Sequence, residues 1–188
     1  RVLDPGCQAD MALVLVSPEQ GMRKSSGVAA LAPSRDFFGE VNLEVRDADL
    51  SRKLRGKLVI ELAEMRGLKT RDSESIKAWV TQREEEWTPK YMEANTKFAR
   101  RCILIGTTND EQFLGDPTGE RRWLPMKVKG QAYTPLLERD RLQLWAEGRE
   151  RWRAEGQLWE KAEKLAKKEH GAFKEHDTWE DAIRSWLG

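Results

Sequence analysis

Short apolar runs alternate with polar segments along the first two thirds of the chain. The runs at 12–16 (ALVLV), 58–62 (LVIEL) and 102–108 (CILIGTT) are typical of buried parallel strands. A weaker run lies at 123–128, and residues 37–45 alternate loosely, as a further strand would. Because segments of helical character separate these runs, the pattern predicts an α/β domain with a central, mainly parallel sheet.

The segments between the runs predict helices and one hairpin. Residues 24–32 form a predicted helix that a proline ends, and DSESIKAWVTQREEE (72–86) forms another. The apolar residues of the second follow helical spacing behind Asp72, a residue type that favours helix N-caps. The stretch TPKYMEANTKFARR (88–101) alternates on both sides of Asn95, which predicts a β-hairpin.

The composition changes after about Thr134, where two helical patterns rich in tryptophan begin. Trp145, Trp152 and Trp159 lie seven residues apart, which predicts an apolar seam that packs these helices on the core. We therefore expect a core at 1–133 and a C-terminal helical region at 134–188.

Composition narrows the classes of function. The chain has 188 residues and a formal net charge of +1, so bulk charge does not attract nucleic acid, and any site for a polyanion must be local. Cys7 and Cys102 have no metal-ligand spacing, which favours a reducing compartment. The sequence shows neither a membrane span nor a signal peptide, so we expect a cytoplasmic protein without a membrane partner. It starts at Arg1 rather than Met, so we expect it to be part of a longer protein.

The loop PEQGMRKSSG (18–27) lies between a predicted strand and a predicted helix, as a phosphate-binding P-loop does. In such a loop main-chain N–H groups surround the phosphates, a lysine reaches the β and γ phosphates, and the next hydroxyl binds Mg²⁺. By itself the match is weak, since Lys-Ser also begins ordinary helices. The matching positions are Gly21, Lys24 and Ser25, whereas Pro18 and Arg23 stand where the motif has glycine.

Polar side chains also follow two other predicted strands. Glu61 and Glu64 lie at the end of one, where carboxylates can hold a Mg²⁺ shell and polarise an attacking water. Asn109 follows the other, where an amide can orient water beside a γ-phosphate. The alternatives are acids at the positive end of a helix and an asparagine in a turn.

Two adjacent arginines, Arg121 and Arg122, lie in TGERRWLP (118–125). The planar guanidinium suits the charge on a phosphoryl group in transfer, and a surface ion pair with Asp116 or Glu120 is the alternative. The sequence does not choose between the two arginines. Loop, acids, amide and arginines occur in the order expected of a ring-forming P-loop ATPase.

Three stretches together resemble the virulence-associated E family: RGKLVIELAEMRGL, YMEANTKFARRCILIGTTN and TGERRWLP. These are P-loop proteins of phages and plasmids, related to superfamily 3 helicases and often fused to a primase. The resemblance runs from about Val2 to Val128. It implies a P-loop NTPase with an AAA+-like three-layer sandwich, in which ATP and Mg²⁺ lie between the subunits of a homo-oligomeric ring, a hexamer at full length.

The resemblance also implies roles for individual residues. The nucleotide would contact Gln20, Gly21, Arg23, Lys24, Ser25 and Ser26. Ser25 and Glu61 would hold the metal, Glu64 would activate water, Asn109 would be the sensor amide, and Arg121 or Arg122 would reach a neighbour's ATP. The function implied is that of an ATP-dependent DNA helicase module in a replication protein of a phage or mobile element.

The predicted hairpin is the candidate DNA-binding element. Tyr91 offers a face for base stacking, worth about 1–3 kcal/mol where it is used. Superfamily 3 helicases carry a basic hairpin before the sensor strand, so the resemblance implies that Lys90, Tyr91 and Lys97 contact single-stranded DNA. The alternative is a solvated hairpin with Tyr91 packed on Trp87. The stretch is locally basic, because it carries Lys90, Lys97, Arg100 and Arg101, offset by Glu93.

Two other functions remain open at this level. The first is a nucleotide- or DNA-binding module whose degenerate loop does not support hydrolysis. The second is an interaction scaffold that binds partners through the tryptophans of the C-terminal helical region and has no affinity for nucleotides.

Overall fold

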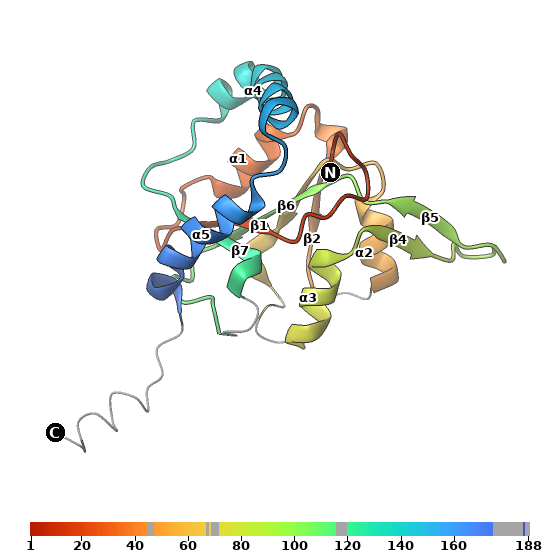
Figure 1. Cartoon of the computed structure of the whole chain (residues 1–188), viewed down its shortest axis with the longest axis horizontal. Helices are drawn as coiled ribbons and strands as arrows, with labels where there is room; N and C mark the ends of the chain where they lie inside the picture. The colour runs from red at the N-terminus through yellow and green to blue at the C-terminus, as the bar shows by residue number, and fades with distance from the viewer. Residues whose placement is uncertain (45–46, 67, 69–71, 116–119, 175–185, 187–188) are drawn as a thin grey trace.

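The computed structural model of the chain has a five-stranded parallel sheet at its centre (Figure 1). It describes residues 1–44, 47–66, 68, 72–115, 120–174 and 186. The strand order is β2-β3-β6-β1-β7, so the prediction of an α/β fold with a mainly parallel sheet is confirmed. The strands are β1 (Ala12–Val16), β2 (Phe38–Val41), β3 (Val59–Leu62), β6 (Ile103–Thr108) and β7 (Trp123–Lys127).

Helices cover both faces of the sheet. The α-helices are α1 (Lys24–Leu31), α2 (Asp47–Leu54), α3 (Ser73–Thr81), α4 (Thr134–Glu155) and α5 (Trp159–Glu169). Short 3₁₀ turns are η1 (Arg35–Phe37), η2 (Ala63–Met65), η3 (Glu120–Arg122) and η4 (His170–Phe173). A separate antiparallel hairpin, β4 (Glu84–Trp87) with β5 (Thr96–Ala99), extends from the body (Figure 1).

Alternation along the strands produces two hydrophobic cores. In β1, Val14 and Val16 face the larger core, which includes buried residues of α2 and α3. Leu13 and Leu15 face the opposite side, where they pack with Val28 of α1 and the side chain of Trp145 from α4. The sheet is therefore the middle of three layers, since successive side chains of a strand point to opposite faces.

The structure corrects the predicted limits of several elements. Asp72 does cap α3, because its carboxylate accepts a hydrogen bond from the Ser75 amide at 2.9 Å. The helix ends at Thr81, however, so the prediction of a helix through residue 86 is wrong. The segment EEEW instead forms β4, and the strand expected over 37–45 is limited to β2.

The predicted hairpin exists, but its first strand lies earlier in the sequence. In the antiparallel register Glu85 faces Phe98, and residues 88–95 connect the strands rather than contributing one. Asn95 stabilises this connection, as its amide donates to Glu86 at 2.6 Å and accepts from Thr88 at 2.5 Å.

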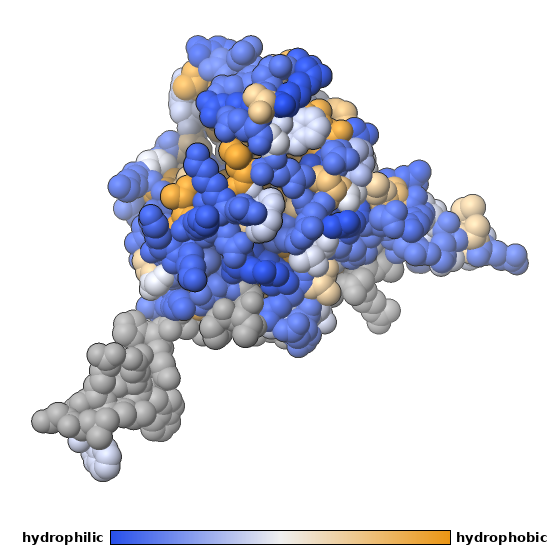
Figure 2. All heavy atoms as spheres, viewed as in Figure 1, coloured by the Kyte–Doolittle hydropathy of each residue, from blue (hydrophilic) through white to orange (hydrophobic). Residues whose placement is uncertain are grey.

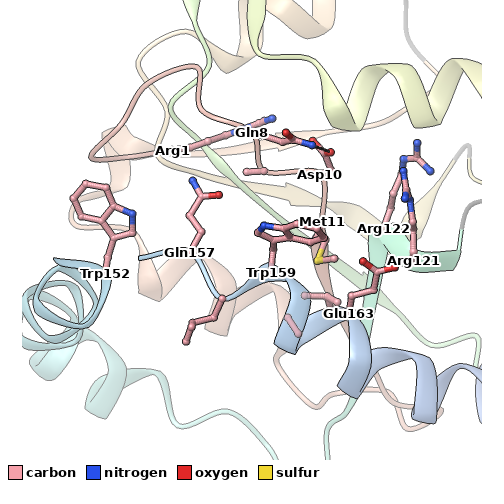
Figure 3. Close-up of a pocket in the computed structure, with 14 residues that line it drawn as sticks. Arg1, Gln8, Asp10, Met11, Arg121, Arg122, Trp152, Gln157, Trp159 and Glu163 are labelled. Atoms are coloured by element: carbon pink, nitrogen blue, oxygen red, sulfur yellow. Dashed lines mark hydrogen bonds between the residues drawn. The ribbon is translucent and has the colours of Figure 1, made fainter. Parts of the chain in front are cut away.

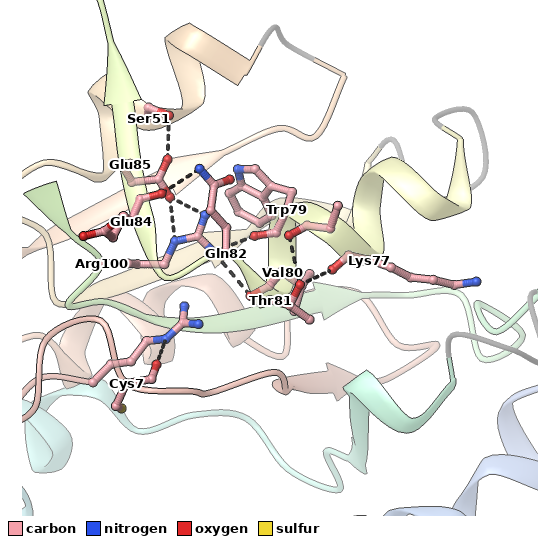
Figure 4. A network of polar contacts seen from close by, with 12 residues as sticks. Cys7, Ser51, Lys77, Trp79, Val80, Thr81, Gln82, Glu84, Glu85 and Arg100 are labelled. Atoms are coloured by element: carbon pink, nitrogen blue, oxygen red, sulfur yellow. Dashed lines mark hydrogen bonds and ion pairs between the residues drawn. The ribbon is translucent and has the colours of Figure 1, made fainter. Parts of the chain in front are cut away.

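Arg100, directly after β5, anchors the hairpin to the body (Figure 4). Arg100 and Glu85 are both fully buried, with Nε of the arginine 2.6 Å from the carboxylate. Nη1 donates to the Trp79 carbonyl at 2.7 Å, and the Ser51 hydroxyl donates to the second oxygen of Glu85 at 2.5 Å. The network joins α2, α3 and the hairpin, so the prediction that counted Arg100 among the basic residues of the DNA-binding hairpin is wrong.

The C-terminal helical region packs on the core through a single tryptophan of the predicted seam. Trp145 donates its indole N–H to the Leu31 carbonyl at 2.7 Å. Trp152 and Trp159 remain 38% and 53% exposed, so the seam does not extend to them. Figure 2 shows hydrophilic residues over most of this face, with hydrophobic ones gathered between α4 and α5. None of the described helices is long and apolar enough to cross a membrane.

We predict that Arg100→Met lowers the free energy of unfolding by about 3–5 kcal/mol, because it leaves the Glu85 carboxylate buried without its cation. Replacing both Arg100 and Glu85 with methionine recovers part of this loss, since no buried charge is then left unpaired. Urea denaturation followed by circular dichroism measures both. Lys97→Met, which removes an exposed ion pair with Glu84 in the same hairpin, is the control and changes stability little. If Arg100→Met and Lys97→Met lowered the free energy of unfolding equally, the anchoring role of Arg100 would be contradicted.

Candidate functional site

The carboxyl ends of β1, β3 and β6 meet at one edge of the sheet, where ligands bind in open parallel sheets. A cavity of about 290 Å³ lies at this edge. Gln20 is exposed and is not among the residues that line it. The lining residues are Gly21, Met22, Arg23, Lys24, Ser25, Ser26, Glu64, Thr107, Thr108 and Asn109.

The first residue of α1, Lys24, connects two of these strand ends. Its ammonium group donates to Oδ1 of Asn109 at 2.5 Å and to the Ser17 carbonyl at 3.2 Å. Partial burial lowers the pKa of Lys24 from its ordinary value. Lysine and asparagine are 85 positions apart in sequence, so the structure brings together two residues that were predicted separately.

The loop before α1 has a left-handed backbone at two positions. Gly21 has a φ of 77°, and Arg23, at the N-cap, has φ 55° and ψ 33°. A residue with a Cβ pays about 1–2 kcal/mol for this region relative to glycine. The loop nevertheless begins the helix normally, since the Arg23 carbonyl accepts from the Gly27 amide at 2.8 Å. Left-handed residues in such loops turn successive N–H groups toward a common anion site.

A segment before α4 supports this loop from outside. The Gln131 side chain donates to the Gly21 carbonyl at 2.9 Å, and the Ala132 amide donates to the Met22 carbonyl at 3.0 Å. Sequence reasoning missed both residues. They follow β7 without any motif, and only the spatial position of β7 beside β1 explains their role.

Glu61 lies inside the sheet rather than in the cavity. It is 1% exposed, and its Oε1 accepts a hydrogen bond from the Thr107 hydroxyl at 2.7 Å. The same hydroxyl oxygen accepts from the Glu64 amide at 3.4 Å. Thr107, which also lines the cavity, therefore links the two acids; hydroxyls at the end of the apolar run ILIGTT were the available signal.

Glu64 reaches the cavity from η2 in a left-handed conformation, with φ 51°. One oxygen of its carboxylate accepts from both Nε and Nη2 of Arg66, at 2.9 and 2.7 Å, and this raises the pKa of the Arg66 guanidinium. The next residue, Met65, packs so closely over Gly106 of β6 that a Cβ there would collide with its sulfur. The glycine thus lets η2 lie against the sheet.

The two arginines lie at the opposite edge of the sheet. They form η3 just before β7, whose first residue, Trp123, pairs with the first residue of β1. β1 has five residues, so at about 3.3 Å per residue its length separates the arginines from the loop by about 16 Å along the strands. Arg121 and Arg122 line a different cavity, of about 500 Å³, together with Trp152 and Trp159 (Figure 3).

The hairpin residues predicted to contact DNA differ in whether their side chains are free of other contacts. Tyr91 is fully exposed with a φ of 66°, so the alternative in which it packs on Trp87 is wrong. Trp87 instead packs edge-to-face on Phe98, with ring centroids 5.7 Å apart. Lys97 pairs with Glu84 at 2.6 Å, and this hydrogen bond raises the lysine pKa. Lys90 is exposed next to Tyr91.

The family model of the virulence-associated protein E-like domain matches residues 1–175. The chain belongs to the virulence-associated protein E-like family. The resemblance inferred from the sequence is therefore confirmed, over a longer segment than the motifs covered. No curated protein matches the chain.

Solved structures resemble this virulence-associated protein E-like chain at low identity. The apo structure of the NrS-1 C terminal region (305–718) has a TM-score of 0.50 and 14% identity, covering 70% of this chain and 35% of that one. An A form apo structure of the same region has a TM-score of 0.47 and 20% identity, covering 72% and 34%. The first likeness supports the α/β fold, and the chain spans about a third of the length of these structures.

We predict that Thr107→Val in this virulence-associated protein E-like domain lowers the free energy of unfolding by about 1–3 kcal/mol, because the buried Glu61 carboxylate loses its hydrogen-bond donor. Valine keeps the shape of threonine, so packing is preserved. The control is Thr81→Val, which removes hydroxyl bonds to helix carbonyls at the end of α3 and costs much less. Urea denaturation measures the free energy of unfolding of both variants. Equal losses would show that the Thr107–Glu61 bond stabilises the fold no more than the hydroxyl bonds at the end of α3 do.

Proposed function

We propose that the cavity beside Lys24 binds ATP with Mg²⁺, and that the chain is the ATPase module of a replication protein that moves on single-stranded DNA. In this proposal it is a P-loop NTPase of the AAA+-like, superfamily 3 helicase type. The single observation that carries the proposal is the contact between Lys24 and Asn109 beside a loop with two left-handed residues.

The path of the chain supports a ligand at this position. From β1 the chain runs through α1 to the outer strand β2, and it later returns to β7 on the other side of β1. The chain thus leaves β1 toward one side of the sheet and leaves its neighbour β6 toward the other. A crevice forms between adjacent strands whose connections leave in opposite directions. The start of α1 points its free N–H groups and its positive end at this crevice, as anion sites at helix starts do.

Lys24 would neutralise the β and γ phosphates, while the loop N–H groups surround them. An incoming phosphate oxygen can replace Asn109 as an acceptor for the ammonium group, which frees the amide to orient the attacking water. The existing bond therefore keeps both groups in place before the nucleotide arrives.

The oxygen ligands near the loop fit Mg²⁺. Ser25 lines the cavity, whereas Glu61 lies inside the sheet, where the hydrogen bonds among described residues engage only Oε1 of its two oxygens. Mg²⁺ keeps several of its waters and takes few protein ligands beside phosphate, so one hydroxyl and one carboxylate reached through water suffice. The ion would neutralise charge on the phosphates.

Glu64 is the proposed general base because its carboxylate is the acid that lines the cavity. Its bond to Arg66 supports a second candidate function, in which the site binds a nucleotide without hydrolysing it. Arg66 occupies one oxygen of this carboxylate, so in the enzyme proposal the nucleotide or a neighbouring subunit would release it. Turnover measurements decide between the two.

The proposed arginine finger acts between subunits. Arg121 and Arg122 line the cavity at the amino edge of the sheet and not the one beside Lys24, so neither serves the nucleotide of its own chain. A homo-oligomeric ring, hexameric in the longer protein, would bring them to the ATP of the next subunit. An arginine supplied in this way raises phosphoryl-transfer rates strongly.

The proposed DNA contact is the tip of the hairpin. Tyr91 presents a free aromatic face, and Lys90 beside it supplies a cation for the DNA backbone. Lys97 contributes after it exchanges Glu84 for a phosphate. Hydrolysis would move this hairpin, because β5 continues through Arg100 into β6 and so to Asn109.

We predict that Lys24→Ala weakens ATP binding by about 10- to 100-fold, the loss of one charge-assisted hydrogen bond. Glu64→Gln keeps binding but lowers turnover by about 10²- to 10⁴-fold if the carboxylate is the base. Calorimetric titration and phosphate release, with and without single-stranded DNA, measure the two effects. Lys53→Ala, at an exposed lysine of α2, is the control.

The oligomeric state is measured in the same samples, since a finger acting between subunits makes turnover depend on assembly. Turnover that Lys24→Ala and Glu64→Gln leave unchanged would overturn the enzyme assignment. Binding without turnover in assembled wild-type protein would favour the second candidate function.

We predict that Tyr91→Ala weakens binding of oligo-dT by about tenfold, through loss of one stacked base. Lys90→Ala reduces the slope of log affinity against log salt by about 0.7, as expected for one phosphate contact on a single strand. Fluorescence anisotropy at several salt concentrations measures both, with Lys53→Ala as control. Unchanged affinity and slope would remove the hairpin from the DNA site.

A further inference from the structure

Arg23 stands at a position of the loop that favours glycine. Its backbone is left-handed, and a Cβ there is strained, yet the hydrogen bonds that begin α1 are formed. Arginine therefore occupies this position while α1 begins at the next residue. Residues with strained backbone conformations concentrate at ligand-binding sites, where the strain is part of the function.

The side chain of Arg23 adds a second cation to the cavity. It lines the same cavity as Lys24, is exposed, and makes no capping hydrogen bond. No carboxylate pairs with either cation among the ion pairs of the described residues. The acid that lines the cavity, Glu64, is already neutralised by Arg66.

The cavity thus presents two adjacent, uncompensated cations together with the N–H groups of a helix start. Every added negative charge on a ligand gains attraction from both cations, and most strongly where water is partly excluded. Lys24 is half-buried at the start of α1, so water is partly excluded around its ammonium group. Guanidinium groups bind phosphate through two parallel hydrogen bonds, which suits a terminal phosphate with its free oxygens.

We infer that Arg23 is a second phosphate-binding residue, which makes this site select a nucleoside triphosphate over the corresponding diphosphate. The inference rests on the proposed function, since it deepens the ligand assignment of the same cavity. Arg23 belongs to the same chain as Lys24, so this selection operates in a single subunit. It does not depend on Arg121 or Arg122 of a neighbour.

The test separates the charge of Arg23 from its backbone strain. Arg23→Asn removes the cation and keeps a side chain that tolerates the left-handed region, whereas Arg23→Gly removes both the cation and the strain. Arg35→Asn makes the same change at an exposed arginine outside the cavity. Calorimetry with Mg²⁺ measures the dissociation constants of a non-hydrolysable ATP analogue and of ADP for each variant.

We expect Arg23→Asn and Arg23→Gly each to weaken the ATP analogue about tenfold and ADP only about two- to threefold, which lowers the selectivity at least threefold. Arg35→Asn leaves both constants unchanged. An unchanged ratio in the two Arg23 variants would overturn the inference, and so would tighter binding of both nucleotides, which would mean that the side chain obstructs the loop.

Lys24→Ala distinguishes the failure of the inference from the failure of the proposed function. If nucleotide binding depends on Lys24 while the Arg23 variants keep the ratio, only the inference fails. If the wild-type chain binds neither nucleotide, or binds both regardless of Lys24, the proposed function and the inference fail together. Thermal unfolding of each variant checks that the fold is intact.

Discussion

The parallel pairing of β1 with β6 is the constraint on which the rest of the site depends. Its register places Val16 beside Thr108, so the loop after one strand and the asparagine after the other lie at the same level. The bond between Lys24 and Asn109 follows from this register. A slip by one residue would turn every side chain of one of these strands to the other face of the sheet.

The same parallel order separates the two groups of charged residues. Parallel strands have all their carboxyl ends at one edge, so the loop, Glu64 and Asn109 share that edge, and residues that precede a strand lie at the other. Arg121 and Arg122 precede β7 and are held there by the pairing of Trp123 with Ala12. Within one chain the two groups therefore line different cavities.

Residues whose role depends on local sequence were predictable, and those that depend on distant partners were not. The apolar runs predicted all three central strands. The loop motif predicted Lys24 and the strand ends predicted Glu64 and Asn109, which line one cavity, whereas Glu61 from the same strand end does not. Arg100 is fully buried because Glu85 and the end of α3 surround it, and an arginine in an alternating, charged stretch gives no sign of this. Gln131 was missed for the same reason.

The departure of Arg23 from the loop motif reflects a wider feature of the chain. Among the described residues, the non-glycine positions with positive φ are Arg23, Glu64, Met65 and Tyr91. Three of them carry side chains proposed to contact nucleotide, water or DNA, and Met65, which follows Glu64 in sequence, packs over Gly106. A motif written in residue types treats glycine as the requirement, whereas the requirement is the backbone conformation. A larger residue that accepts the strain keeps that conformation and adds a functional group to the site, as strained residues at binding sites do.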